Sequence, residues 1–271
     1  MPIITLSRGT YSGGKELAER VAARVGAPCL SREILVEAAA RFGVSEKTLT
    51  EAMDRPPSMF ERFSHQRDAY LAFVRSTLLQ HAAAGSLVYH GNAGHLLLAD
   101  VVNVIRVRTV APMSFRVPAA MERLGLDEKR AIAHIQRVDR ERERWTRFLY
   151  GIAWQDPSLY DLVVNLEHLD VEEACEIISS MAALKRFGWT EESRREVADK
   201  ALASLVVAEL AKDESTRGSA FEVTASSGVV TVRGTTGLRE VHASVPRVVR
   251  AVPGVAELHC EVTLGSDLVP D

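Results

Sequence analysis

The sequence predicts an α/β protein with a three-layer parallel sheet, followed by a second, smaller α/β sandwich. An apolar run at residues 3–7 leads through a glycine-rich turn into a helix. Further short runs are apolar on both faces and are separated by helical segments, as in a parallel sheet covered by helices. Beyond residue 194 the strand-like runs instead alternate apolar and polar residues, and in the two runs that flank a turn at 226–228 this alternation is typical of half-buried antiparallel strands.

Capping residues and periodicity predict the elements of the first part. A helix is expected from Gly14. Ser31 can cap a second helix at 32–42, and Ser45 with Thr48 begins a third helical stretch, which the Arg-Pro-Pro-Ser run at 55–58 ends. A long helix is expected at 67–84 and a closing helix at 171–187. Strands are expected at 86–90, 101–107 and 161–166.

A change of composition near residues 187–194 indicates a second domain. Its expected elements are a helix at 195–211, two strands flanking a turn at 226–228, a helix at 241–252 and a final strand at 258–264. The valines of the later helix recur at the i, i+4, i+7, i+8 and i+11 positions of one face. We therefore expect a domain at 1–187, a linker at 188–193, an α-β-β-α-β domain at 194–265 and a tail at 266–271.

Composition and charge limit the classes of function. The chain has 271 residues and a net charge of −3, so it carries no overall signature of a nucleic-acid partner. It contains no run of about 18 apolar residues and begins directly with a strand, so we expect neither a membrane span nor a signal peptide, and a cytoplasmic location. Three scattered cysteines fit reduced thiols. The histidines show no metal-ligand spacing, so no metal site made of protein ligands alone is expected.

The glycine-rich turn matches a phosphate-binding loop. Gly9, Gly14 and Lys15 stand at the G-x4-G-K spacing. A strand, a tight turn and a helix N-terminus aim backbone N–H groups and a positive dipole end at one point, which suits a polyphosphate. Lys15 can reach the terminal phosphates, and Glu16 stands where other such loops hold magnesium through a hydroxyl. The expected nucleotide-binding residues are Gly9, Ser12, Gly13, Gly14, Lys15 and Glu16.

Several motifs in order resemble the cytidylate-kinase-like family of P-loop proteins over residues 1 to about 185. They are the strand and loop at 3–18, Gly-Ala-Pro at 26–28 with Ser-Arg-Glu-Ile-Leu at 31–35, Leu-Val-Tyr-His-Gly at 87–91, Val-Asp-Arg-Glu-Arg at 138–142, and Asp-Pro at 156–157 with Tyr-Asp-Leu-Val-Val-Asn at 160–165. The resemblance implies use of ATP, with Mg²⁺ carried by the nucleotide. Family members often carry a residue without a hydroxyl after the basic residue of the loop, so Glu16 is compatible with the family.

The resemblance also implies a role for two arginines of a basic segment. Residues 106–147 contain eleven basic and six acidic side chains. Arg137 and Arg142 flank Asp139 where related kinases place arginines that close over the donor phosphates. Together with Lys15 they are the expected catalytic residues. The alternative is a solvated helix whose arginines pair with the interleaved carboxylates.

The acceptor side departs from the family pattern. Relatives usually carry an arginine that contacts the monophosphate where this chain has Asn92, and commonly an aspartate where it has Ser31. Asparagine cannot copy the bidentate phosphate contact of an arginine. Arg8 and Arg32 could substitute for it. The expected substrate-binding residues are therefore Arg8, Arg32 and Asn92.

Residues from about 194 to 265 resemble a BON domain, through the helix at 195–211, Gly-Val-Val-Thr-Val-Arg-Gly at 228–234 and Val-Pro-Gly-Val at 252–255. Such modules are non-catalytic, and the resemblance implies that this one binds a lipid surface, a ligand or a partner protein. The sequence carries no signal of oligomeric state.

These observations favour ATP-dependent phosphoryl transfer to a nucleoside monophosphate or another small acceptor, with the BON module regulating or localising the enzyme. A nucleotide-binding regulatory protein without turnover is the alternative, and the altered acceptor position favours it. A scaffold in which the loop is vestigial is the third hypothesis.

Overall fold

The computed structural model describes residues 2–54, 66–91 and 93–265. The chain divides into two compact units. Of the described residues, the first contains 2–33, 53–54 and those within 85–189. The second contains residues 34–52 and 190–265 together with the helix α4 (Gln66–Ala84).

Five parallel strands form the sheet of the first unit. They are β1 (Ile3–Arg8), β2 (Cys29–Leu30), β3 (Leu87–His90), β4 (Val104–Val110) and β5 (Leu162–Asn165). Their order is β2-β3-β1-β4-β5, and every neighbouring pair is parallel. β1 is therefore central. The loop that follows it opens between the carboxyl ends of β3 and β4, at the edge where parallel α/β sheets bind their ligands.

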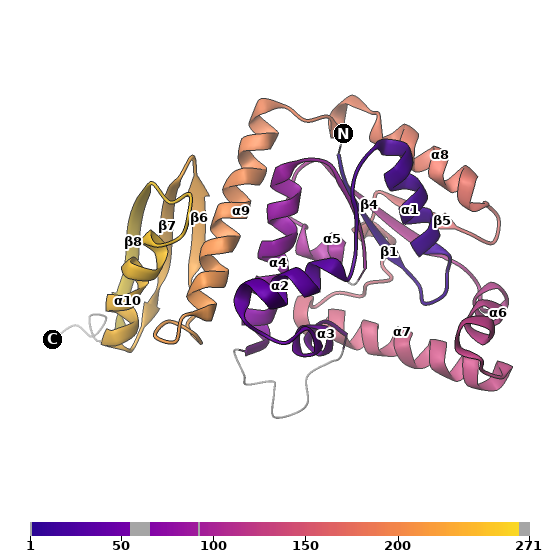
Figure 1. Ribbon diagram of the computed structural model, residues 1–271, viewed down its shortest axis with the longest axis horizontal. Helices are drawn as coiled ribbons and strands as arrows, with labels where there is room; N and C mark the ends of the chain where they lie inside the picture. Colours follow the sequence, from indigo (N-terminus) through magenta and orange to yellow (C-terminus); the bar gives the residue numbers. More distant parts are fainter. Residues whose placement is uncertain (1, 55–65, 92, 266–271) are drawn as a thin grey trace. The chain divides into compact units, whose positions relative to one another are not determined.

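Two helices cover one face of this sheet side by side, α1 (Gly14–Val25) and α8 (Val171–Ala182) (Figure 1). Leu17 and Val21 of α1 and Ile178 of α8 share one buried core with Leu6 of β1. The helix that begins at the glycine-rich loop is thus anchored along its apolar stripe, and burial of that stripe fixes the position of the loop.

Two further helices of the first unit, α6 (Met113–Leu124) and α7 (Glu128–Tyr150), pack on each other. Their small core contains Val117, Ala120, Ala131 and Ile135. Asp127 caps α7 by accepting a hydrogen bond from the Arg130 N–H at 2.8 Å. The short helix α5 (Gly94–Leu97) follows β3 and contacts β1.

The second unit contains most of α2 (Glu33–Phe42) and of α3 (Glu46–Asp54), together with α4, α9 (Glu191–Lys212) and a small sheet. α4 packs along α9, and Gln80 Nε2 of α4 donates to the Ala201 carbonyl of α9 at 3.2 Å. The sheet has the order β6 (Glu222–Ser226), β7 (Val229–Thr236), β8 (Glu257–Leu264). β6 is antiparallel and β8 parallel to β7, and α10 (Arg239–Arg250) lies against β8.

The predicted fold class is confirmed. The first unit is a parallel sheet flanked by helices, and the elements after residue 190 follow in the order α-β-β-α-β. The predicted turn between β6 and β7 is present, with Ser227 and Gly228 both left-handed. None of the helices in the described ranges has the length and apolar character needed to cross a membrane.

Several element boundaries differ from their predictions, and three of these differences have a clear local cause. The strand expected at 101–107 begins at Val104, because Asn103 takes a left-handed conformation (φ 57°) that asparagine tolerates. The helix expected at 171–187 ends at Ala182, because Leu184 is extended and a separate 3₁₀ turn follows at Lys185–Phe187. α9 begins at Glu191 rather than at residue 195, because Thr190 and Ser193 form a capping box.

Residues 191–193 of the expected linker are thus helical. The domain boundaries at 187 and 194 stay predictions. The expected break at 55–58 and the expected tail at 266–271 lie outside the described residues.

Candidate functional site

The loop after β1 has the backbone geometry of an anion-binding turn. Tyr11 and Gly13 are left-handed, with φ of 60° and 78°. Gly13 directly precedes α1, so the N–H groups in the first turn of this helix have no acceptor within the helix. Such N–H groups and the positive end of the helix dipole attract phosphate. The backbone can therefore receive a phosphate group at the N-terminus of α1.

Close packing beneath the loop requires a glycine at position 14. A Cβ there would lie 2.7 Å from Arg8 Cβ and 2.7 Å from Thr109 Oγ1. A Cβ at Gly9 would meet nothing closer than 3.6 Å, so space does not demand glycine at that position. Ser12 is buried and closes the turn from inside. Its hydroxyl donates to the Gly9 carbonyl at 2.9 Å and lies 3.1 Å from Thr109 Oγ1.

An open cleft of about 680 Å³ lies at the loop. Residues 10–16 line it from the loop side, and Phe115, Ala119 and Arg123 of α6 line it from the opposite side. The Phe115 side chain is exposed, whereas most large apolar side chains in the described part of the chain are buried. The volume falls in the range of about 300–1,000 Å³ that small-molecule sites occupy. The cleft is large enough for the phosphates of a nucleotide and part of its nucleoside.

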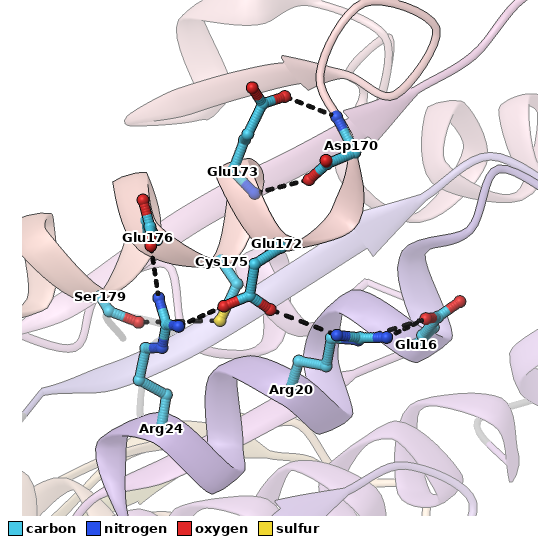
Figure 2. A network of polar contacts seen from close by, with 9 residues as sticks. All are labelled: Glu16, Arg20, Arg24, Asp170, Glu172, Glu173, Cys175, Glu176 and Ser179. Carbon is cyan, nitrogen blue, oxygen red and sulfur yellow. Dashed lines mark hydrogen bonds and ion pairs between the residues drawn. The ribbon is translucent and has the colours of Figure 1, made fainter.

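Lys15 and Glu16 lie on the exposed side of α1. Lys15 Nζ lies 3.6 Å from the Glu19 carboxylate with both side chains largely exposed, so this ion pair is weak and Lys15 can turn into the cleft. Glu16 accepts a hydrogen bond from Arg20 at 2.9 Å, and Arg20 also pairs with Glu172 of α8 (Figure 2). Arg20 therefore offsets the negative charge that Glu16 would otherwise place beside an incoming phosphate.

Arg142 of α7 contacts the loop directly. Its Nη1 donates to the Arg8 carbonyl at 3.0 Å and to Thr10 Oγ1 at 3.2 Å. Thr10 Oγ1 in turn donates to Asp139 Oδ1 at 3.0 Å, and Arg116 of α6 donates to Asp139 Oδ2 at 2.6 Å and to the Thr10 carbonyl at 2.7 Å. Thr10 is thus held by both α6 and α7, and this network fixes one side of the loop.

The predicted site residues divide into two groups by position. Gly9, Ser12, Gly13, Gly14, Lys15, Glu16, Arg8 and Arg142 lie in or against the loop. Arg137 does not contact it. Its guanidinium pairs with Glu141 at 3.0 Å one turn along α7, with 56% of its side chain exposed, as the ion-pair alternative expects. Arg32 is exposed in the turn before α2 and does not line the cleft. Asn92 lies outside the described residues.

Arg8 separates the cleft from a second, smaller cavity at the carboxyl ends of β1 and β3. This cavity has a volume of about 30 Å³, and Arg8 lines both hollows. Burial of the guanidinium lowers the pKa of Arg8, and the neighbouring charges of Arg142 and Arg123 lower it further. Among the described residues no carboxylate pairs with the half-buried Arg8, and such a cation attracts an anion or a neutral oxygen acceptor.

The described acidic and hydroxyl groups beside the loop are engaged with other protein groups. Within the described ranges no three His, Cys, Asp or Glu side chains gather as a set of ligands. The hydroxyls of Thr10 and Ser12 are both engaged with protein groups, and Glu16 pairs with Arg20.

Several residues of the site have no clear signal in the sequence. Arg116 and Asp139 lie in the basic segment at 106–147, but only the packing of α6 on α7 brings them together at Thr10. His95 and Tyr160 are 65 positions apart and meet beneath the small cavity, with 3.2 Å between His95 Nε2 and the Tyr160 hydroxyl. Spacing along the chain predicts none of these pairs.

Comparisons with known proteins agree with this geometry. Residues 3–168 match the cytidylate kinase-like family. A cytidylate kinase of Desulfurococcus amylolyticus is 30% identical over 66% of this chain and 91% of its own length. A cytidylate kinase of Pyrobaculum aerophilum is 27% identical over 65% of this chain and 90% of its own length. Among solved structures, an uncharacterised protein of Eubacterium ventriosum has the same fold, with a TM-score of 0.51, 24% identity, and coverage of 66% of this chain and 97% of that one.

Proposed function

Because the chain belongs to the cytidylate kinase-like family, we propose that it transfers the γ-phosphoryl group of ATP to a nucleoside monophosphate or another small acceptor. Family membership supports a kinase-like activity on a nucleotide or other small molecule. ATP with its magnesium as donor, and the identity of the acceptor, are parts of the proposal.

The geometry of the glycine-rich loop is the observation that carries the proposal. A left-handed Gly13, a Gly14 without room for a Cβ and the open end of α1 face a cleft that can hold a nucleotide. In the proposed reaction Lys15 and the loop N–H groups bind the donor phosphates. Arg142, already bonded to the loop, stabilises the charge that develops in the transition state. Arg137 would have to leave Glu141 to take part.

For the second unit we propose a supporting role. The order α-β-β-α-β after residue 190 is compatible with a BON domain that binds a lipid surface, a ligand or a partner protein. The module would then regulate or localise the enzyme in the cytoplasm.

A nucleotide-binding regulatory protein without turnover is the second candidate. It is favoured by Asn92, which replaces the arginine that relatives usually place against the acceptor phosphate, and by the position of Arg137 away from the loop. Without these two guanidinium groups, ATP could bind while the acceptor is held poorly.

Steady-state phosphoryl transfer from ATP, measured on the full chain with CMP, dCMP, UMP and AMP, separates the two candidates. Phosphorylation of any of these four acceptors supports the kinase, provided that the activity is lost when Lys15 is replaced. ATP binding without turnover on all four supports the regulator. Failure to bind ATP would contradict both and favour a vestigial loop.

A further inference from the structure

Strand β8 is an edge of the small sheet with which no further strand of the described residues pairs. It spans eight residues, and its ladder with β7 runs along one side only (Figure 1). The opposite edge strand, β6, has five residues and packs against α9. Edge strands that stay unpaired are commonly short or carry a proline, a lysine or a bulge. β8 has none of these features, so its open side is suited to pairing with another strand.

Alternate residues of β8 direct their backbone groups away from β7. The Glu257 N–H donates to the Gly228 carbonyl at 3.3 Å, so the backbone of Glu257 faces β7. In a parallel ladder every second residue bonds to the same neighbouring strand. The N–H and C=O groups that point outward therefore belong to Leu258, Cys260 and Val262.

One of these outward groups has a side-chain contact. The Val262 carbonyl lies 3.1 Å from His242 Nε2 of α10, which agrees with its direction away from β7. A carbonyl oxygen has two lone pairs, so this contact leaves one for a strand that pairs with β8.

The side chains of β8 alternate between two faces of the small sheet. The even-numbered residues lie on the same face as the buried Val232, which is the register partner of Cys260. The odd-numbered residues Glu257, His259 and Glu261 lie on the other face and are exposed. His259 Nε2 lies 3.3 Å from the Glu257 carboxylate. The open edge therefore presents a basic group between two acidic groups.

This charge pattern is complementary to itself when the strand runs antiparallel. A twofold axis at Cys260 places His259 opposite Glu261 of a second copy, and the same contact recurs on the other side of the axis. Leu258 then lies opposite Val262, so outward backbone groups meet outward backbone groups as hydrogen-bonded pairs. Glu261 is held in place for this contact, because it accepts from Arg233 of β7 at 2.7 Å.

Neighbouring registers bring like charges together. An axis at Glu261 places this carboxylate opposite its own copy, and an axis at His259 places Glu257 opposite Glu261. Like charges directly opposite each other destabilise a strand pair. An axis between two residues would set outward backbone groups against groups that already bond to β7. The charge pattern therefore selects the register centred on Cys260.

We propose that two copies of this chain associate through β8, in the antiparallel register centred on Cys260, and join their small sheets into one continuous sheet. The opposite charges of His259 and Glu261 select the partner and the register, and the outward backbone groups of β8 supply the hydrogen bonds. None of the residues of β8 lines the cleft at the glycine-rich loop, so this association is separate from the proposed nucleotide site.

Sedimentation equilibrium of the full chain across the micromolar range tests the proposal. We expect a reversible equilibrium between monomer and dimer. His259→Glu places a carboxylate opposite Glu261 at both symmetry-related contacts, so it should raise the dimer Kd roughly tenfold or more. His259→Lys keeps a basic group there and should dimerise at least as tightly as the wild type. The matched control is Thr224→Glu, which adds the same charge to the same face of the sheet but on β6, and it should behave as the wild type.

Cross-linking with a short bis-maleimide tests the register. Cys175 is only 1% exposed, so in the variant Cys29→Ser the reactive thiol is Cys260. We expect a cross-linked dimer from this variant and none after the further change Cys260→Ser.

A wild type that stays monomeric over the whole concentration range would overturn the proposal. A dimer that His259→Glu affects no more than Thr224→Glu would place the interface elsewhere and overturn it as well. A dimer that responds to His259→Glu but does not cross-link through Cys260 would contradict the register centred on that residue.

Discussion

Thr10 shows how single residues hold the glycine-rich loop in place. Its hydroxyl and its carbonyl are bonded to three charged side chains from two helices, Arg116, Asp139 and Arg142. The Arg116–Asp139 ion pair is largely buried, with 12% and 23% of the side chains exposed. Charge-assisted hydrogen bonds of this kind are among the stronger ones in proteins. The loop is therefore preorganised for its ligand without a contribution from Lys15.

The pKa of a buried histidine makes stability depend on pH. The pKa of His95 falls from its ordinary value of 6.5 to about 4, so the unfolded chain binds a proton at a higher pH than the folded chain does. The contribution of the neutral, buried His95 to the free energy of unfolding is complete above pH 6.5 and is lost as the pH falls from 6.5 toward 4. Between pH 7.5 and 5 the loss should be on the order of 2 kcal/mol.

Urea unfolding of the wild type and of His95→Gln at these two pH values measures this difference. The variant should lose less free energy of unfolding on acidification than the wild type does. His168→Gln is the control, because 74% of the His168 side chain is exposed. It should keep the wild-type dependence. Equal pH dependence in wild type and His95→Gln would show that His95 is not held neutral.

At the residue scale, the sequence predicts the positions of side chains only where local spacing determines the geometry. Lys15 and the glycines of the loop belong to one continuous motif, so their positions follow from the order of strand, turn and helix. Arg137 and Arg142 belong to one predicted helix but differ in position, because five residues at 3.6 per turn leave their side chains about 140° apart around the helix axis. One arginine therefore meets the loop and the other pairs with Glu141.

Helices α1 and α8 are joined by a chain of ion pairs on their exposed sides. Glu172 of α8 pairs with both Arg20 and Arg24 of α1, Arg20 continues to Glu16, and Arg24 to Glu176 (Figure 2). The series of ion pairs begins at the first turn of α1, next to the loop. It links the helix that follows the loop to the helix that follows the last strand of the sheet.

The shared carboxylate of Glu172 should make this link sensitive to salt. Glu172→Gln leaves Arg20 and Arg24 with weaker partners, and we expect a small fall in melting temperature at low ionic strength. The difference from wild type should disappear in 1 M NaCl, where the screening length falls to about 3 Å from about 10 Å at 0.1 M. Glu167→Gln, at an exposed carboxylate outside the network, is the matched control. A difference that persists in 1 M NaCl would show that Glu172 acts through packing instead.

Element types could be predicted from the sequence more reliably than element ends. Periodicity identified the parallel strands and the amphipathic helices, because burial imposes it over many residues. Ends depend on single conformations such as the left-handed Asn103 and on capping pairs such as Thr190 and Ser193. The capping box at the start of α9 does not follow the usual sequence pattern, because a serine stands where glutamate is more common. It was therefore not predicted.

At the level of the whole molecule, the order of elements predicted two α/β parts, and each is present as a sheet with its helices. The packing of α4 along α9 was not predictable, because the two helices are more than a hundred residues apart in the chain. Helix α4 therefore belongs to the same compact unit as the C-terminal sheet. The first sheet nevertheless contains every strand that positions the loop, so the proposed nucleotide site lies within the first unit.

Calorimetric titration of the full chain with ATP and magnesium tests the central claim most directly. Lys15 should leave its weak contact with Glu19 and bind the phosphates, so Lys15→Ala should weaken binding by about 1–3 kcal/mol, or roughly 5- to 150-fold. Lys185→Ala, the same change of charge at an exposed site away from the loop, should bind as the wild type does. Equal ATP affinity in wild type and Lys15→Ala, or no affinity in either, would contradict the assignment of the loop as the nucleotide site.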